Sequence, residues 1–337
     1  MDVNFTLPNE KKEREPSVFA AACLFAVAAA GQLVVSYIGM FLEWALGSVP
    51  GLDESFFENA VQILYYGLFL LLPVALYSRR RPGMTDAMRV SDIKGSTAAL
   101  CALAGVAAML FVNYVRFPWV MFIEALGGTL PAGRVAVPTS PAGLCASILM
   151  VAVLPGVAEE LLFRGVLLSA WEEKGSYRAV IVSALWFTAL HSSFSGIPAE
   201  FICGAILAFL VISTNSLFAG IIFHTVYNAA GLILSYLASA QTAGAEAAEA
   251  ASVFESVGGV PGLISVLFSI LISGTVLFVI LRRVDRARIR EERFDFGVPA
   301  LPERARSLAE WAVLCSGGAI AAAYYFLDFL RIAGIVQ

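Results

Sequence analysis

Six polar residues lie inside long apolar stretches of the sequence: Glu159, Glu160 and Arg164 in one stretch, His191 in the next, and His224 and Asn228 in a later one. The two histidines are the only ones in the chain. An ionisable side chain inside a bilayer costs at least about 2.5 kcal/mol, so such residues are rare unless they pair, line an aqueous cavity or take part in chemistry. Since one shared site would satisfy all of these groups at once, we expect them to converge.

The spacing of the first group separates the roles of its two carboxylates. On a helix Glu160 and Arg164 are four residues apart and share a face, whereas Glu159 points about 100° away. We therefore expect Glu160 to pair with Arg164, which leaves Glu159 as a candidate base for activating water. The alternative is an interhelical salt bridge with a spare glutamate.

The histidines extend this chemistry. His191 ends the segment Phe187-Thr188-Ala189-Leu190-His191, and His224 shares a helix face with Asn228. Hydrolysis of a peptide bond needs an activated water, a donor for the tetrahedral oxyanion and a proton for the leaving amine, and Glu, His and Asn side chains can supply these parts.

Metal chemistry is the open alternative. Two imidazoles and a carboxylate match the three ligands of a catalytic zinc, so Glu159, His191 and His224 are candidate metal ligands and the cofactor is Zn²⁺ or none. The sequence has no HExxH and no GxSxG, which excludes a zincin-like helix and leaves no compelling serine mechanism.

The elements that carry these residues are predicted to be membrane spans. The chain is 59% hydrophobic and 14% charged, with a mean hydropathy of +0.81, whereas soluble domains have about a quarter charged residues. Apolar runs near the roughly 20 residues that cross a bilayer recur along it. We predict an all-α, polytopic transmembrane helical bundle of about nine spans, near residues 18–46, 60–77, 97–115, 142–170, 179–194, 199–213, 217–238, 260–281 and 308–330.

Charge indicates the orientation and the partners. The loops at 79–94 and 282–293 are rich in arginine, and because basic loops stay on the cytosolic side we predict a cytosolic N-terminus. The protein should be a multi-pass protein of the plasma (inner) membrane with lipid as a partner. A net charge of -4 without a basic, aromatic-rich patch excludes nucleic acid as a partner.

The chain divides into four predicted parts: a cytosolic tail at 1–17, N-terminal helices and loops at 18–141, a catalytic core at 142–238, and C-terminal helices with a basic cytosolic loop at 239–337. Two smaller expectations concern the outer parts. We expect a helix break from Pro118 to Pro141 with Trp119 as an interfacial anchor, and we interpret Glu43 and Asp328 as incidental carboxylates near helix ends.

Taken in order, the three motifs EExxxR (Glu159, Glu160, Arg164), FxxxH (Phe187, His191) and HxxxN (His224, Asn228), each on its own span, resemble those of the CPBP family of intramembrane endopeptidases (CAAX prenyl protease 2 and bacteriocin-processing, also called Abi). The resemblance covers residues 142–238.

The resemblance implies a glutamate-dependent endopeptidase with a cytosol-facing cavity and a peptide or lipidated protein as substrate. It implies that Glu159 activates water with His191, and that His224 and Asn228 hold the oxyanion. Glu160 and Arg164 are then the orienting pair. Members of the family have been described as metalloproteases, so the metal stays open.

Two other classes of protein fit intramembrane Glu, Arg and His. One is a proton-coupled transporter, because such residues also form proton relays; broken helices at matching positions in two halves would favour it, and the sequence shows none. The other is a non-catalytic immunity or scaffold protein of the same fold. The complete polar set favours the protease.

Overall fold

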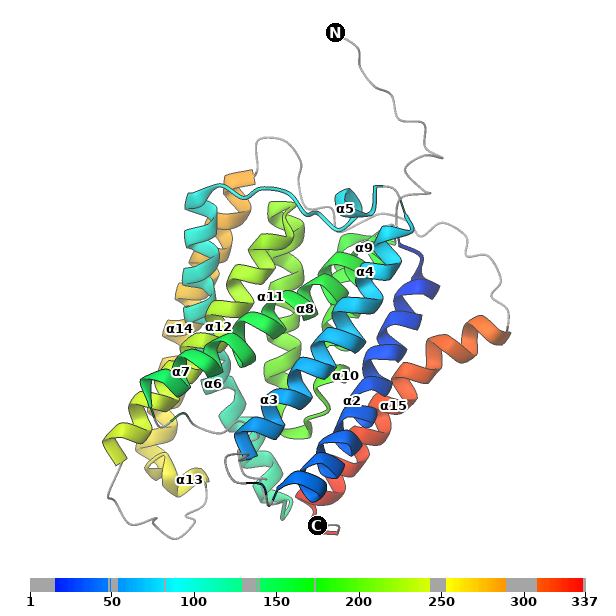
Figure 1. Ribbon diagram of the computed structural model, residues 1–337. Coiled ribbons are helices and arrows are strands. Elements are labelled where there is room, and N and C mark those ends of the chain that lie inside the picture. The colour runs from blue at the N-terminus through cyan, green and yellow to red at the C-terminus, as the bar shows by residue number, and fades with distance from the viewer. Residues whose placement is uncertain are drawn as a thin grey trace.

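The structure is a computed structural model that describes residues 16–47, 49, 54–81, 83–128, 138, 140–172, 174–242, 253–288 and 308–335. Within these ranges the regular structure consists of helices, with no strand (Figure 1). The predicted all-α polytopic bundle is confirmed.

Several of the long helices are continuous rods in which α-helical and π-helical segments alternate. In chain order the segments are α2 (Val18–Leu46), α3 (Glu54–Leu64), η1 (Tyr65–Leu71), α4 (Leu72–Arg79), α5 (Met84–Ala87), α6 (Gly95–Ala125), α7 (Pro141–Ser147), η2 (Ile148–Val153), α8 (Leu154–Glu160), η3 (Leu161–Leu168), α9 (Ser169–Glu172), α10 (Ser176–His191), η4 (Phe194–Gly196), α11 (Ile197–Thr214), α12 (Leu217–Thr242), α13 (Val253–Ser256), α14 (Gly259–Arg288) and α15 (Leu308–Ile332). Of these, η1, η2 and η3 are π-helical and η4 is a 3₁₀ turn.

By length and composition, seven of the described helices can cross a membrane. They are Val18–Leu46, Phe57–Arg79, Gly95–Ala125, Pro141–Glu172, Phe194–Thr214, Leu217–Ser239 and Gly259–Arg286. The two further spans predicted from the sequence correspond to α10, which has 16 residues, and to α15. The count of about nine spans and the cytosolic N-terminus stay predictions.

The predicted helix break at Pro118 is wrong, because α6 runs through this residue to Ala125. A proline removes one backbone N–H, and transmembrane helices tolerate this where neighbouring elements pack against them. Here Trp119 Nε1 donates to Phe194 O at 2.9 Å, and its ring lies 5.6 Å from that of Phe194. Trp119 therefore links α6 to the turn after α10 through a hydrogen bond and a ring contact. Residues 129–137 and 139 of the predicted loop lie outside the described residues.

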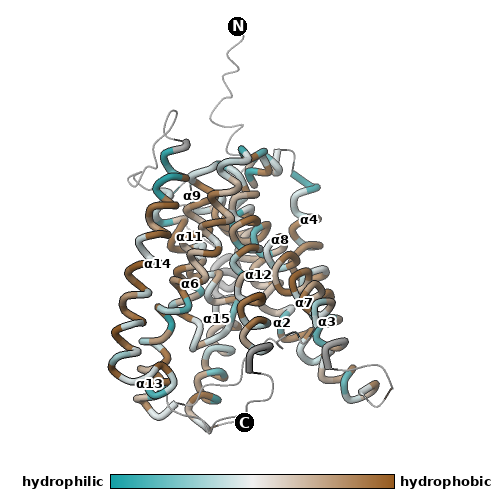
Figure 2. The backbone as a smooth tube through the Cα atoms, turned by 90° about the vertical axis from the view of Figure 1, so that its left-hand side faces the viewer, coloured by the Kyte–Doolittle hydropathy of each residue, from teal (hydrophilic) through white to brown (hydrophobic). Residues whose placement is uncertain are grey.

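The arginine-rich ends of α4 and α14 lie at the same end of the bundle as α5 and the start of α2 (Figure 1). Figure 2 shows hydrophobic residues along the length of α14 and hydrophilic ones at this end. The segment after α5 is tied down here, since Arg89 Nε donates to Asn215 Oδ1 at 3.0 Å and Ser91 Oγ donates to Asn215 O at 2.7 Å. The described arginine-rich ends of these two helices thus share one side, as the orientation argument requires.

Small residues allow the helices around the core to approach closely. A Cβ on Gly105 of α6 would lie 2.7 Å from Phe223 O and 3.1 Å from Tyr227 N of α12. Ala104 and Ala108 on α6 are fully buried as well. This contact sets the position of α12, which carries His224 and Asn228.

Replacing Gly105 with alanine should push α6 away from α12. Because an added methyl group in a filled core is destabilising, we expect Gly105→Ala to lower the free energy of unfolding by about 1–3 kcal/mol. Thermal unfolding of the detergent-purified protein measures this. The matched control is Gly231→Ala on α12, where an added Cβ meets no atom within 4 Å. A Tm for Gly105→Ala equal to that of Gly231→Ala would contradict the close-packing argument.

Candidate active site

The predicted ion pair is present at the junction of α8 and η3. Arg164 Nη1 donates to Glu160 Oε1 at 2.8 Å, and both side chains are fully buried. Arg164 Nη2 donates to Gly204 O at 2.9 Å, and its guanidinium lies 4.6 Å from the centre of the Phe187 ring. The positive charge is thus shared between a carboxylate, a carbonyl and an aromatic face.

Glu160 also contacts one of the two histidines, His224. His224 Nδ1 lies 3.0 Å from Glu160 Oε1, the same oxygen that Arg164 binds. The other oxygen of Glu160 packs against α12, where a Cβ on Gly220 would come within 2.6 Å of it. A larger residue at position 220 would therefore displace the carboxylate.

Glu159 is nearly buried and has its two oxygens in different settings. Oε1 accepts a hydrogen bond from the Tyr66 hydroxyl at 2.9 Å. Oε2 has no hydrogen-bond partner among the described residues, but it lies 3.9 Å from His191 Nε2 and 4.0 Å from His224 Nε2. Three groups from three separate helices thus face one point.

The hydrogen bonds of the outer ring nitrogens settle which nitrogens face Glu159. His191 Nδ1 lies 2.8 Å from Phe187 O, and since a carbonyl only accepts, Nδ1 must carry the proton. By the same argument His224 Nδ1 donates to the Glu160 carboxylate. In its neutral form each ring therefore presents the lone pair of Nε2 towards Glu159, and a ring that gains a second proton presents an N–H there instead.

The spacing suits a water molecule better than a zinc ion. A water about 2.8 Å from Glu159 Oε2 and from either Nε2 spans the observed 3.9–4.0 Å at an angle of about 90°. A zinc ion about 2.0–2.2 Å from the same atoms spans it only at angles of about 130° or more, far from the tetrahedral value of about 109°. The ligand types fit zinc, but among the described residues no group of three or more His, Cys, Asp or Glu side chains is placed to hold a metal ion.

Asn228 lies one turn beyond His224 on α12, and its amide is engaged elsewhere. Asn228 Nδ2 donates to Val151 O of η2 at 3.1 Å. The structure thus brings Glu159, Glu160, Arg164 and both histidines together. The side chain of Asn228 instead contacts the backbone of η2.

All three π-helical segments that the structure describes contribute to this centre, through Tyr66 on η1, Val151 on η2 and Arg164 on η3. Two of them end just before a proline, as α4 and α8 each have proline in the first turn. Since proline lacks the N–H that would close the preceding turn, it eases the wider winding. π-helical turns are rare and occur frequently at functional sites.

The structure corrects the interpretation of Asp328 as incidental. Its side chain is 4% exposed, and Oδ2 accepts from Phe194 N at 2.7 Å. This bond holds the turn that follows His191, where Ser192 ends α10 in the left-handed conformation at φ 51°. Sequence reasoning passed over Asp328 because it stands near a helix end, and Tyr66 because a tyrosine in an apolar run is unremarkable.

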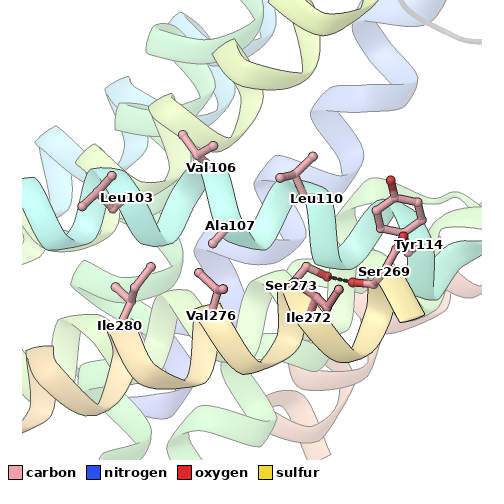
Figure 3. Close-up of a pocket in the computed structure, with 10 residues that line it drawn as sticks. All are labelled: Leu103, Val106, Ala107, Leu110, Tyr114, Ser269, Ile272, Ser273, Val276 and Ile280. Atoms are coloured by element: carbon pink, nitrogen blue, oxygen red, sulfur yellow. Dashed lines mark hydrogen bonds between the residues drawn. The ribbon is translucent and has the colours of Figure 1, made fainter. Parts of the chain in front are cut away.

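Access to the centre is uneven. The His191 side chain is 32% exposed, whereas those of Glu159 and His224 are 6% and 4% exposed. An apolar cavity of about 410 Å³ lies apart from the centre, between α6 and α14, and is lined by residues such as Leu103, Leu110 and Val276 (Figure 3). These α6 residues lie on a different face from Gly105, which contacts α12.

The fold and the site define a multi-pass membrane protein with a buried Glu/Arg/His centre. Residues 141–230, which include all three motifs, match the family model of the type II CAAX prenyl endopeptidases described as Rce1-like. The resemblance of the motifs to the CPBP family is thereby confirmed for this part of the chain. No curated protein and no solved structure matched the chain in the corresponding comparisons.

Removing Arg164 should destabilise the protein strongly. Arg164→Ala leaves the fully buried Glu160 carboxylate without its cation, and breaking a buried pair in this way costs about 3–5 kcal/mol. Chemical denaturation in detergent micelles measures the loss. As a control, the exposed Arg283→Ala on α14 should change stability by no more than about 0.5 kcal/mol. Equal stabilities of the two variants would show that the pair is not structurally important.

Proposed function

We propose that the protein is an intramembrane endopeptidase of the CAAX prenyl protease type that hydrolyses a peptide bond near the cytosolic side of the membrane. The observation that carries the proposal is the buried Oε2 of Glu159, which has no hydrogen-bond partner in the described part of the chain and faces the Nε2 atoms of His191 and His224 at 3.9 and 4.0 Å. The family match at residues 141–230 supports the same class of reaction. The substrate is a peptide or a lipidated protein that reaches the site from the membrane.

Glu159 is the general base. A water between Glu159 Oε2 and His191 Nε2 gives one proton to the carboxylate while its oxygen attacks the scissile carbonyl carbon. His191 accepts a hydrogen bond from the second O–H and orients the water. When the C–N bond breaks, Glu159 passes its proton to the leaving amine, so the carboxylate is regenerated.

His224 and Asn228 stabilise the oxyanion. Because His224 Nδ1 already donates to Glu160, the ring can donate from Nε2 only in its doubly protonated form. Asn228 has a second amide hydrogen besides the one that binds Val151 O, and in this scheme the second hydrogen donates to the oxyanion. No step of this scheme uses a metal.

Glu159→Gln should abolish cleavage of a quenched fluorescent CAAX-type peptide library by the detergent-purified protein. An amide cannot take the proton of the water, and general base catalysis contributes about 10²–10⁴-fold to the rate. We expect a loss in this range with an unchanged Tm, a similar loss for His191→Ala, and no effect of a chelator.

The matched control is Glu43→Gln, which changes an exposed carboxylate in the same way and should retain full activity. Cleavage by Glu159→Gln at the wild-type rate would sink the assignment of the base. Activity lost to a chelator and restored by zinc would overturn the metal-free scheme. A wild-type protein that cleaves no member of the library would favour the transporter or scaffold readings.

Asn228→Ala tests the oxyanion role separately from the structural one. Loss of one oxyanion donor lowers kcat by about 10²–10³-fold, and KM should be little changed. Asn113→Ala on α6 is the control, since this exposed amide lies outside the site. A loss in kcat below about threefold would mean that Asn228 serves only to bind Val151 O.

A further inference from the structure

The centre contains a residue from outside the matched region of 141–230. Tyr66 lies on η1, and its hydroxyl donates to Glu159 Oε1 at 2.9 Å across a sequence separation of 93 residues. The other oxygen, Oε2, has no hydrogen-bond partner among the described residues. The bond from Tyr66 is therefore the contact that can orient the Glu159 carboxylate. One side chain of the N-terminal helices thus touches the proposed base.

The rotation of the Glu159 carboxylate depends on this contact. The terminal torsion of a glutamate is broad, with no strong intrinsic preference, so hydrogen bonds decide which way the two oxygens point. With Oε1 held by Tyr66, Oε2 is the oxygen that faces His191 and His224. Without the Tyr66 hydroxyl, no other described hydrogen bond determines which oxygen of Glu159 faces the histidines.

Tyr66 is itself well fixed. The π-to-α transition follows between Leu71 and Leu72, just before Pro73, and the ring of Tyr66 packs edge-on against that of Tyr65 at 5.1 Å. The helix that carries it contacts both α8 and η3. A rigid donor on a neighbouring helix can define the orientation of a carboxylate to within the tolerance that catalysis requires.

We infer that Tyr66 is a positioning residue of the protease, which holds Glu159 Oε1 so that Oε2 meets the attacking water. The inference rests on the proposed function of Glu159. Tyr66 does not contact the reacting atoms, and it acts through Glu159 alone. The reaction therefore depends on η1 as well as on the three motif-bearing helices.

The kinetic test is Tyr66→Phe, which removes the hydroxyl and keeps the ring. A lost hydrogen bond to a charged group corresponds to about a tenfold to hundredfold fall in kcat, and KM should stay the same because the substrate is not contacted. Tyr65→Phe is the matched control and should keep kcat within about twofold. In the Glu159→Gln background, Tyr66→Phe should cause no further loss.

The outcomes separate this inference from the proposed function. If Glu159→Gln is inactive while Tyr66→Phe has wild-type kcat, the positioning role is overturned and the protease assignment stands. A rise in KM with unchanged kcat would also overturn it, because it would place Tyr66 in substrate binding. An equal fall in kcat for Tyr65→Phe would mean that packing of η1 is responsible.

A second measurement needs no activity. In a thermal unfolding cycle of Tyr66→Phe with Glu159→Ala, the Tm changes should be non-additive, because either substitution removes the same hydrogen bond. The corresponding cycle of Tyr65→Phe with Glu159→Ala should be additive. Additive changes for the Tyr66 pair would overturn the contact between Tyr66 and Glu159, even if the protein proved to have no protease activity.

Discussion

The buried pair of Glu160 and Arg164 is the interaction on which the rest of the site depends. Two adjacent glutamates inside a bilayer are tolerable only if at least one is neutralised, and Arg164 does this at 2.8 Å in a fully buried setting. The paired carboxylate then fixes the proton of His224 on Nδ1 and turns Nε2 of this ring towards Glu159. The ion pair of Glu160 thereby determines how His224 is oriented next to Glu159.

Close backbone contact is the second requirement, and glycine provides it on each side of the pair. Gly204 offers its carbonyl to Arg164, and a Cβ there would lie 3.0 Å from Ala184 Cα of α10. Gly220 leaves room for Glu160 Oε2, and Gly156 lets α8 approach Thr225 of α12. These glycines bring α8, α10, α11 and α12 near enough for short side chains to meet.

The sequence predicted those residues of the site whose charged or polar side chains are energetically unfavourable inside a bilayer. Glu160 and Arg164 were assigned to each other because they share a helix face, and the histidines were grouped with them because isolated polar residues are expensive in a bilayer. This reasoning did not identify Tyr66 or Asp328. Burial of a tyrosine has a small energetic cost, and a carboxylate near a helix end can be solvated without a partner. Pro118 was misread because a helix breaker in water is tolerated where Trp119 and other neighbours pack around it.

The contacts of the site cross the boundaries drawn from the sequence. Tyr66, at 18–141, binds Glu159 of the core, and Asp328, at 239–337, holds the turn after His191. Gly105, which also belongs to 18–141, allows α6 to pack closely against α12. Since Glu159 and the turn after His191 are both held by contacts from outside 142–238, the motif-bearing helices alone do not determine how these side chains are oriented. The motifs supply the proposed reacting groups, and the flanking helices supply contacts that orient Glu159 and the turn after His191.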